Sequence, residues 1–225
     1  MISIEDNSIL ERFVQDEMED PTPRKHIDGY TIYASRIFRQ PKTFGDAVIS
    51  DLGEAEDGKL QRHHNAQPNW YRSPEVMLKA DWSYPADIWN VGAMIWDLFE
   101  GKGMFFGDDP EFKVYSTRAH LAEIIGMLGP PPLDLLKRGR RVDEFFDEKG
   151  ISTPSTVLKV AYPKFDVGNF IAEVAVPDNS LEGSEERLEG DNKKAFLEFM
   201  RSMLQWRPED RKTAKDLLQD PWLNS

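Results

Sequence analysis

Residues 71–101 read YRSPEVMLKADWSYPADIWNVGAMIWDLFEG. The stretch begins with a polar turn, and a run of apolar residues follows from Pro85 to Phe99. Proline suits the first position of a helix, where its missing N–H group costs nothing, and Gly101 suits the position just after the last turn. The pattern therefore predicts a helix from Pro85 to Phe99. Apolar side chains on nearly every face predict that this helix is buried.

Asp87 lies in the first turn of the predicted helix. A carboxylate buried at a helix start is costly unless another group pairs with it. It could simply cap the free N–H groups of its own helix, and taken alone this is the commoner role for such an aspartate. The alternative is a paired aspartate with a functional role, and the neighbouring motifs bear on that choice.

Two short motifs around this helix start resemble a pattern of eukaryotic protein kinases. In that family the activation segment ends in A-P-E, and the next helix carries D-x-W-x-x-G. Here Ser73-Pro74-Glu75 corresponds to the first motif, with serine in place of alanine, and Asp87, Trp89 and Gly92 correspond to the second. The resemblance implies a kinase-like fold built around this helix.

Asp51-Leu52-Gly53 precedes these motifs and follows a short apolar run, Ala47-Val48-Ile49, which predicts a strand ending in a turn. Mg²⁺ prefers oxygen ligands such as a carboxylate at such a turn, although acidic residues are frequent in turns of every kind. In order with Ser-Pro-Glu, the three residues resemble the kinase magnesium motif D-F-G, with leucine in the middle. By that resemblance, Asp51 would hold the metal ion that bridges the phosphates of ATP.

The residues between these motifs, 54–70, would form a short activation segment. His63-His64 is expected in an exposed loop, because adjacent histidines do not share a face and no third metal ligand is suitably spaced. Many kinases carry a threonine five positions before the alanine of A-P-E, whereas Pro68 stands there and has no hydroxyl group. No serine, threonine or tyrosine lies between Gly53 and Trp70, so activation by phosphorylation within the segment is not expected.

Further motifs narrow the resemblance to the CMGC group of kinases. Two motifs are similar to that group: Tyr71-Arg72 and Leu128-Gly129-Pro130-Pro131. Within the group, the motifs most resemble those of fungal kinases similar to the serine/arginine-rich protein kinases. Towards the C-terminus, Leu204 to Arg211 resembles the ending L-x-x-x-P-x-x-R. In the family this arginine pairs with the A-P-E glutamate, so Arg211 is expected to meet Glu75. Without the resemblance, Arg211 would be interpreted as a surface residue.

The predicted fold class is mainly α with a few short strands, as in the C-terminal lobe of a protein kinase, with the N-terminal lobe absent. Residues 1–225 would form one partial kinase domain. Its expected parts are a family insertion at 5–46, the magnesium motif and activation segment at 47–75, core helices at 76–128, a CMGC-type insert at 129–190 and terminal helices at 191–225.

Periodicity and turn residues predict the remaining elements. A helix capped by Asp6 or Asn7 is expected from Ile9 to Met18, and a short strand or extended piece at 31–33. Further helices are expected at 111–127, 134–137, 142–146, 191–204 and 213–218. Residues 34–46 and 151–190 are expected to be surface loops. The first of these carries Arg36, Arg39 and Lys42, which could bind phosphate but more commonly belong to a solvated loop.

The composition of the chain excludes several classes of site and of protein. The 225 residues include no cysteine, which excludes disulfides and thiolate metal sites. The formal net charge is −12, which disfavours nucleic acid and favours basic partners, although solubility alone is an equally common reason for such a charge. The first residues do not resemble a signal peptide, and no run of about 18 apolar residues predicts a membrane span. An intracellular protein of the cytoplasm or nucleus is expected.

Several kinase motifs do not occur in the sequence. It contains no G-x-G-x-x-G loop, no strand lysine with its helix glutamate and no H-R-D-type catalytic loop. In kinases these lie before the magnesium motif, so the chain is expected to begin just after the catalytic loop, with Met1 as the last part of the adenine site. The family implies ATP and Mg²⁺ as cofactors, but without those groups the chain alone is expected to bind them poorly and to lack kinase activity.

The sequence leaves three interpretations of function open. In the first, the chain is part of a serine/threonine kinase that transfers the ATP γ-phosphate to proteins, with Arg/Ser-rich segments as candidate substrates. In the second, it is complete and acts as a non-catalytic, pseudokinase-like interaction module. In the third, it is a non-functional remnant whose exposed apolar surface favours aggregation.

Overall fold

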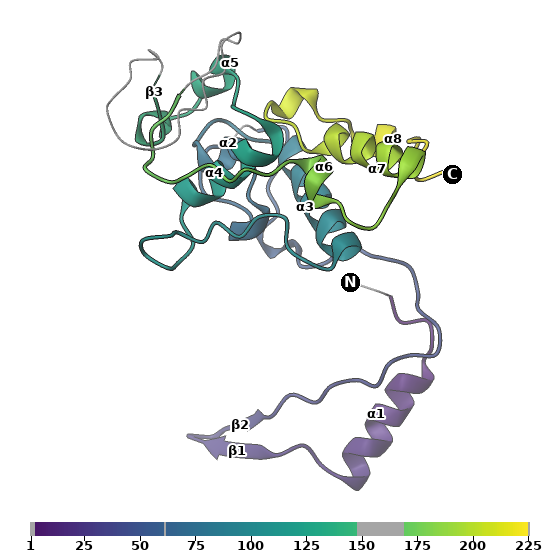
Figure 1. Cartoon of the computed structure of the whole chain (residues 1–225). Helices are drawn as coiled ribbons and strands as arrows, with labels where there is room; N and C mark the ends of the chain where they lie inside the picture. Colours follow the sequence, from purple (N-terminus) through teal and green to yellow (C-terminus); the bar gives the residue numbers. More distant parts are fainter. Residues whose placement is uncertain (1–2, 61, 148–168, 225) are drawn as a thin grey trace. The chain divides into compact units, whose positions relative to one another are not determined.

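The structure is a computed structural model that describes residues 3–60, 62–147 and 169–224. The chain forms two compact units, Met1–Glu56 and Asp57–Ser225. Figure 1 shows both units and labels their α-helices and strands β1, β2 and β3. Met1, which was expected at the adenine site, lies outside the described residues. No helix of the described residues is both long and apolar enough to cross a membrane.

The first unit contains one helix and one hairpin. Helix α1 covers Ser8–Glu19, and strands β1 (Arg24–Ile27) and β2 (Tyr30–Tyr33) pair antiparallel. Asp28 and Gly29 form the two-residue turn between the strands with φ of 47° and 85°. Positive φ at both turn residues is the geometry that matches the twist of a hairpin. The helix and β2 were predicted, whereas β1 was not.

A small polar and aromatic cluster holds this unit together. The Glu17 carboxylate accepts the Thr22 N–H group at 2.7 Å and pairs with Arg36 at 3.2 Å. The rings of Phe13 and Phe38 lie 4.7 Å apart between centroids. Arg36 is therefore engaged inside the unit, in keeping with a structural role for one of the three basic residues of this loop.

The strand predicted at 47–49 is wrong. Among the described residues of this stretch, Ala47 alone takes part in a β-bridge, and it is an isolated one. Asp51 then adopts the left-handed conformation with φ of 63° and precedes the short 3₁₀ helix η1, Leu52–Glu54. A turn does occur at this point, but no strand leads into it, because a single isolated bridge at Ala47 does not continue as a ladder through the next two residues.

The second unit is mostly helical. Its elements, in chain order, are η2 (Asn69–Tyr71), α2 (Pro74–Met77), α3 (Pro85–Glu100), α4 (Thr117–Leu128), α5 (Leu133–Leu136), η3 (Val142–Glu144), β3 (Phe146–Asp147), β4 (Asn169–Phe170), α6 (Leu181–Ser184), α7 (Gly190–Met203), η4 (Pro208–Asp210) and α8 (Ala214–Leu217). The two strands pair antiparallel as a small ribbon. The mainly helical class that the sequence predicts is thus the observed one for the described residues.

Helices α3 and α7 build the centre of the core. Trp96 of α3 stacks on Phe196 of α7 with ring centroids 6.1 Å apart, and both side chains are buried. Gly92 allows the close approach, because a Cβ atom there would lie only 3.1 Å from the Met203 side chain. Residues predicted to face inward from α7 do so: Phe196, Phe199, Met200 and Met203.

The prediction that α3 is buried is wrong for one face of the helix, which is exposed. Val91, Met94 and Leu98 are 37 %, 45 % and 77 % exposed, and Asp87 on the same face is exposed too. We call these four residues the α3 stripe. Within the second unit no described element covers it. Asp87 is therefore neither a buried carboxylate nor a cap, since no side chain caps this helix start. Gly101 ends the helix with φ of 72°, as predicted.

Helix α4 begins later than predicted, at Thr117 instead of residue 111. The Asp109 carboxylate accepts the N–H groups of Glu111 and Phe112 and thereby folds those residues into a turn. Ser116 then caps the helix by accepting the Ala119 N–H group at 3.1 Å. Side-chain hydrogen bonds of this kind compete with the helix for the same backbone donors.

The loop predicted at 151–190 is only partly a loop. Residues 151–168 lie outside the described residues, but β4 and α6 follow. Ala172, Val174 and Leu181 are buried, so this part belongs to the core and not to the surface. Gly126 of α4 makes room for it, because a Cβ atom would collide with Asn179.

Candidate functional site

The candidate site centres on residues 66–75, which we call the site segment; it includes η2 and the first turn of α2. Gln67 fixes its shape from a left-handed backbone position, φ 68°. The Gln67 side-chain oxygen accepts the Ser73 N–H group at 2.9 Å and the Ser73 hydroxyl at 3.1 Å, and its amide nitrogen donates to the Ala86 carbonyl at 2.8 Å. Arg72 closes the other side, donating to the carbonyls of Ala66 and Gln67 at 3.1 Å each.

Tyr71 ties the site segment to α3. Its hydroxyl donates to the Asp97 carboxylate at 2.6 Å, and the other oxygen of that carboxylate accepts the Met104 N–H group at 2.9 Å. This hydrogen bond to Asp97 raises the pKa of Tyr71 above its ordinary value. Asp97 thus holds both the segment and the chain that leaves α3.

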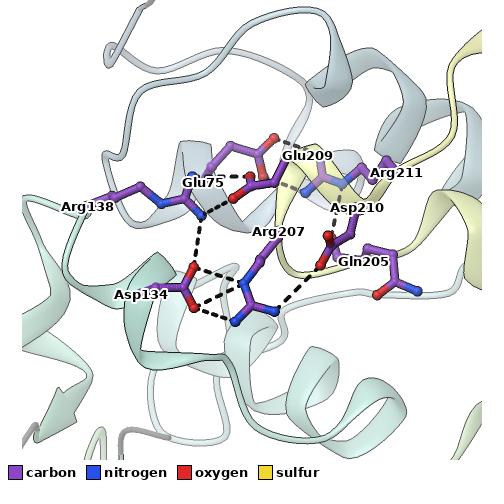
Figure 2. Close-up of polar contacts among 8 residues, drawn as sticks. All are labelled: Glu75, Asp134, Arg138, Gln205, Arg207, Glu209, Asp210 and Arg211. Carbon is purple, nitrogen blue, oxygen red and sulfur yellow. Dashed lines mark hydrogen bonds and ion pairs between the residues drawn. The ribbon is translucent and has the colours of Figure 1, made fainter. Parts of the chain in front are cut away.

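Glu75 and Arg211 form a buried ion pair at the base of the segment. Both guanidinium amino groups donate to the two carboxylate oxygens at 2.7 Å, and the two side chains are 1 % and 0 % exposed. Arg211 also donates to the carbonyls of Gln205 and Pro85 at 3.0 and 2.9 Å, and its guanidinium lies 5.2 Å from the Trp89 ring centroid. Figure 2 shows this pair, and it is the contact that the kinase resemblance implies.

An exposed charge network lies next to the buried pair (Figure 2). Arg207 of the loop before η4 donates to both oxygens of Asp134 at the start of α5, with the Nε distances at 2.9 and 3.0 Å. Arg138 joins the network through Asp134 at 3.5 Å and Glu209 at 3.0 Å. The network connects α5 to the loop that carries Arg211.

The outer surface beside the segment is aromatic and acidic. Trp70 and Phe106, both about half exposed, meet edge to face with ring centroids 5.8 Å apart. Glu123 of α4 accepts the N–H groups of Phe106 and Gly107 at 2.9 and 3.0 Å. Partial burial raises the pKa of Glu123, and the neighbouring Asp108 raises it further. An aromatic pair flanked by carboxylates is a surface that suits a cationic side chain.

The predicted magnesium residue, Asp51, belongs to the first unit, whereas the site segment belongs to the second. Its side chain is exposed. Among the described residues, no group of three or more His, Asp or Glu side chains is arranged to hold a metal ion. His63 and His64 are exposed as expected, and His64 meets the Trp82 ring edge to face at 5.2 Å. A single carboxylate does not fit a complete Mg²⁺–ATP site by itself.

Sequence reasoning missed two residues that shape the site. Gln67 carries no local signal, since a glutamine in a polar loop is ordinary and its role depends on a left-handed backbone. Asp97 sits in a predicted helix and was not distinguished from a solvated charge. The Asp97 position, on the turn of α3 next to the segment, becomes evident only when the fold is known.

Comparison with known proteins shows which family the sequence of this chain matches. The chain matches the family model described as protein kinase domain over residues 40–223. A serine/threonine protein kinase of Aspergillus fumigatus is 42 % identical over 221 residues, which cover 97 % of this chain and 51 % of that protein. The serine/threonine-protein kinase SKY1 of Saccharomyces cerevisiae is 31 % identical over 189 residues, covering 84 % of this chain and 23 % of SKY1.

A more distant relative is dual specificity tyrosine-phosphorylation-regulated kinase 3 of Homo sapiens, which is 29 % identical over 168 residues. That match covers 70 % of this chain and 26 % of the human protein. The chain therefore spans about half the length of the Aspergillus relative and a smaller share of the others.

Proposed function

This chain belongs to the protein kinase family, and we propose that it is part of a serine/threonine protein kinase of the CMGC group, similar to the serine/arginine-rich protein kinases. The reaction would transfer the γ-phosphate of ATP to a serine or threonine hydroxyl of a protein. The observation that carries the proposal is the site segment, locked by Gln67, Tyr71 and the Glu75–Arg211 pair. Such a rigid turn is suited to hold a peptide, and positioning is most of what a kinase supplies.

The 225 residues would not carry the reaction alone. Phosphoryl transfer depends on positioning and on neutralising the phosphate charge. The family uses ATP with Mg²⁺, which supplies that neutralisation when bound. In this chain Asp51 would be one ligand, and the sequence offers neither the phosphate lysine nor a catalytic loop. We therefore expect negligible kinase activity from the chain by itself.

The exposure of the α3 stripe supports the proposal that this chain is part of a larger kinase domain. Apolar residues exposed in a row on a central helix usually mark an interface. In a complete kinase this surface would be covered by further parts of the domain. The same exposure explains why the isolated chain should be prone to associate or aggregate.

The protein substrate would carry basic residues. Trp70 and Phe106 offer aromatic faces to a guanidinium group, and Asp108 and Glu123 offer carboxylates beside them. The chain as a whole bears a net charge of −12, which attracts basic segments over distance. Arg/Ser-rich segments combine these positive charges with acceptor serines, so they are the substrate class we propose.

A non-catalytic interaction module is the second candidate. Pro68 favours it, because this residue stands where many kinases place a threonine hydroxyl near the catalytic groups. On this alternative the site segment and its acidic surroundings would still bind a basic partner, without phosphate transfer. The two candidates make opposite predictions for the size and activity of the natural protein.

The first experiment is an immunoblot of the endogenous protein with an antibody against the C-terminal region. A band well above 25.9 kDa supports the kinase, and a single band at 25.9 kDa supports the module. The natural protein is then assayed with Mg²⁺–ATP and an Arg/Ser-rich peptide, beside the same peptide with every arginine replaced by glutamine. Transfer that Asp51→Asn abolishes supports the kinase. Metal-dependent transfer by the pure 225-residue chain would overturn the proposed inactivity.

A further inference from the structure

A continuous row of side chains joins Arg72 of the site segment to Arg211, which follows η4. It starts with the Arg72 guanidinium, whose central carbon lies 5.8 Å from the Tyr115 ring centroid. Neighbouring rings then follow at centroid distances of 5.8 Å (Tyr115–His120), 5.1 Å (His120–Phe105) and 5.9 Å (Phe105–Trp89), and Trp89 contacts Arg211. The Arg211 end is fixed by a buried ion pair, so the question is what fixes the Arg72 end.

Arg72 has no carboxylate partner among the described residues. Its guanidinium is held by two carbonyls of the site segment and by the face of the Tyr115 ring. A cation over an aromatic ring is attracted by the ring quadrupole, and more strongly where water is partly excluded. The direction of the Arg72 side chain therefore depends on where Tyr115 stands.

Tyr115 is itself held by His120. Its hydroxyl lies 3.1 Å from His120 Nδ1, one turn into α4, and the His120 side chain is fully buried. Gly107 closes the other side, because a Cβ atom there would lie 2.7 Å from the tyrosine ring and 3.1 Å from the His120 Cβ atom. The ring is thus confined by a hydrogen bond at its tip and by the chain at its edge.

We propose that Tyr115 and His120 are positioning residues of the site segment. The Tyr115 ring supports the Arg72 guanidinium, and His120 fixes that ring through its hydroxyl, so that the carbonyls of residues 66 and 67 stay in place before a peptide binds. Neither residue belongs to a motif in the sequence. The link to peptide binding rests on the proposed function, whereas the ordering of the segment does not.

A neutral histidine suits this place. Burial, and to a smaller extent the nearby charge of Arg72, lower the pKa of His120 to about 3. The imidazole therefore carries no charge at neutral pH and does not repel the nearby guanidinium of Arg72. It still offers a ring nitrogen to the tyrosine hydroxyl, which a leucine of similar volume would leave unpaired.

The test uses the natural protein with His120→Leu, His120→Asn and Tyr115→Phe. Asparagine can place a polar atom where Nδ1 stands, so it is the conservative replacement. Phe112→Leu is the matched control, because it removes another cation–π pair, Arg118 over Phe112 at 5.1 Å, whose ring is exposed and is not part of the row that joins Arg72 to Arg211. Two readouts are measured: amide hydrogen exchange of Ser73, whose N–H group is bonded to Gln67, and peptide KM and kcat.

His120→Leu and Tyr115→Phe should speed exchange of the Ser73 amide by about tenfold, the effect of losing one buried hydrogen bond. They should raise the peptide KM roughly fivefold with little change in kcat. His120→Asn should recover most of both effects, and Phe112→Leu should show neither.

Equal losses in His120→Leu and His120→Asn, or faster exchange spread evenly over α7 as well, would overturn the proposal, because both results indicate mere loss of stability. Unchanged Ser73 exchange would also overturn it. If the natural protein has no kinase activity, the proposed function fails, and the exchange result still decides the role of His120 and Tyr115.

Discussion

The hydroxyl group of Tyr71 donates a 2.6 Å hydrogen bond to the carboxylate of Asp97, which joins the site segment to the last turns of α3. Tyr71→Phe removes this bond and leaves the ring in place. Because the acceptor is charged, we expect the free energy of unfolding to fall by about 1.5 kcal/mol. Urea denaturation measures the change. Tyr84→Phe is the control, because Tyr84 is exposed, and equal stability of the two variants would contradict the prediction.

Removal of one partner of the Glu75–Arg211 pair should be far more costly. Arg211→Met leaves the Glu75 carboxylate buried and unpaired, so we expect a loss of about 3–5 kcal/mol. The double variant Glu75→Gln with Arg211→Met should lose less than the sum of the single changes, because no lone charge remains. Additive losses in a double-mutant cycle would show that the two charges are not coupled.

The exposed ion pair beside it should contribute little. Asp134→Asn weakens the Arg207 contact, but both side chains are partly solvated, so we expect a loss below about 1 kcal/mol. The loss should shrink further at high salt, since exposed charges are screened. A loss above about 2 kcal/mol would mean that the network between α5 and η4 acts as part of the core.

His120 should make stability depend on pH over a range that begins at its ordinary pKa of 6.5, above the range in which carboxylates titrate. In the unfolded chain the group takes up a proton near its ordinary pKa of 6.5, whereas in the fold it stays neutral down to about 3. The unfolded state therefore binds more protons in this window, and stability falls as pH falls. The slope from this group approaches about 1.4 kcal/mol per pH unit.

Unfolding measured between pH 7 and about pH 4.5 checks this expectation. His120→Asn should flatten the curve, because asparagine does not titrate. His64→Asn is the control, since this exposed histidine is not buried by folding. An unchanged slope in His120→Asn would show that His120 is not the group responsible.

The long helices could be predicted because several independent signals coincide at their ends. Helix α3 has Pro85 at its start and Gly101 just after its end, and α7 has four inward apolar residues at helical spacing. The start of α4 could not, because Asp109 and Ser116 redirect the backbone through side-chain hydrogen bonds that periodicity does not register. Strand β1 was missed because its sequence, Arg-Lys-His-Ile, lacks an apolar alternation.

Only part of the candidate site could be predicted from the sequence. The contact between Glu75 and Arg211 came from the family resemblance, since no local pattern connects residues so distant in the chain. The exposure of the α3 stripe was not foreseen, because composition tells how apolar a helix is but not which neighbours cover it. Gln67 and His120 act through backbone geometry and burial, which become visible only in three dimensions.

The separation of Glu75 and Arg211 in the sequence also determines how long after Glu75 its partner is synthesised on the ribosome. The two residues are 136 positions apart, and ribosomes add about 5–20 residues per second, so Arg211 is made roughly 7 to 27 seconds after Glu75. During that interval Glu75 lacks the Arg211 guanidinium, so the buried ion pair cannot form. A nascent chain paused in this interval should be a chaperone client, and slower translation between the two codons should lengthen that dependence.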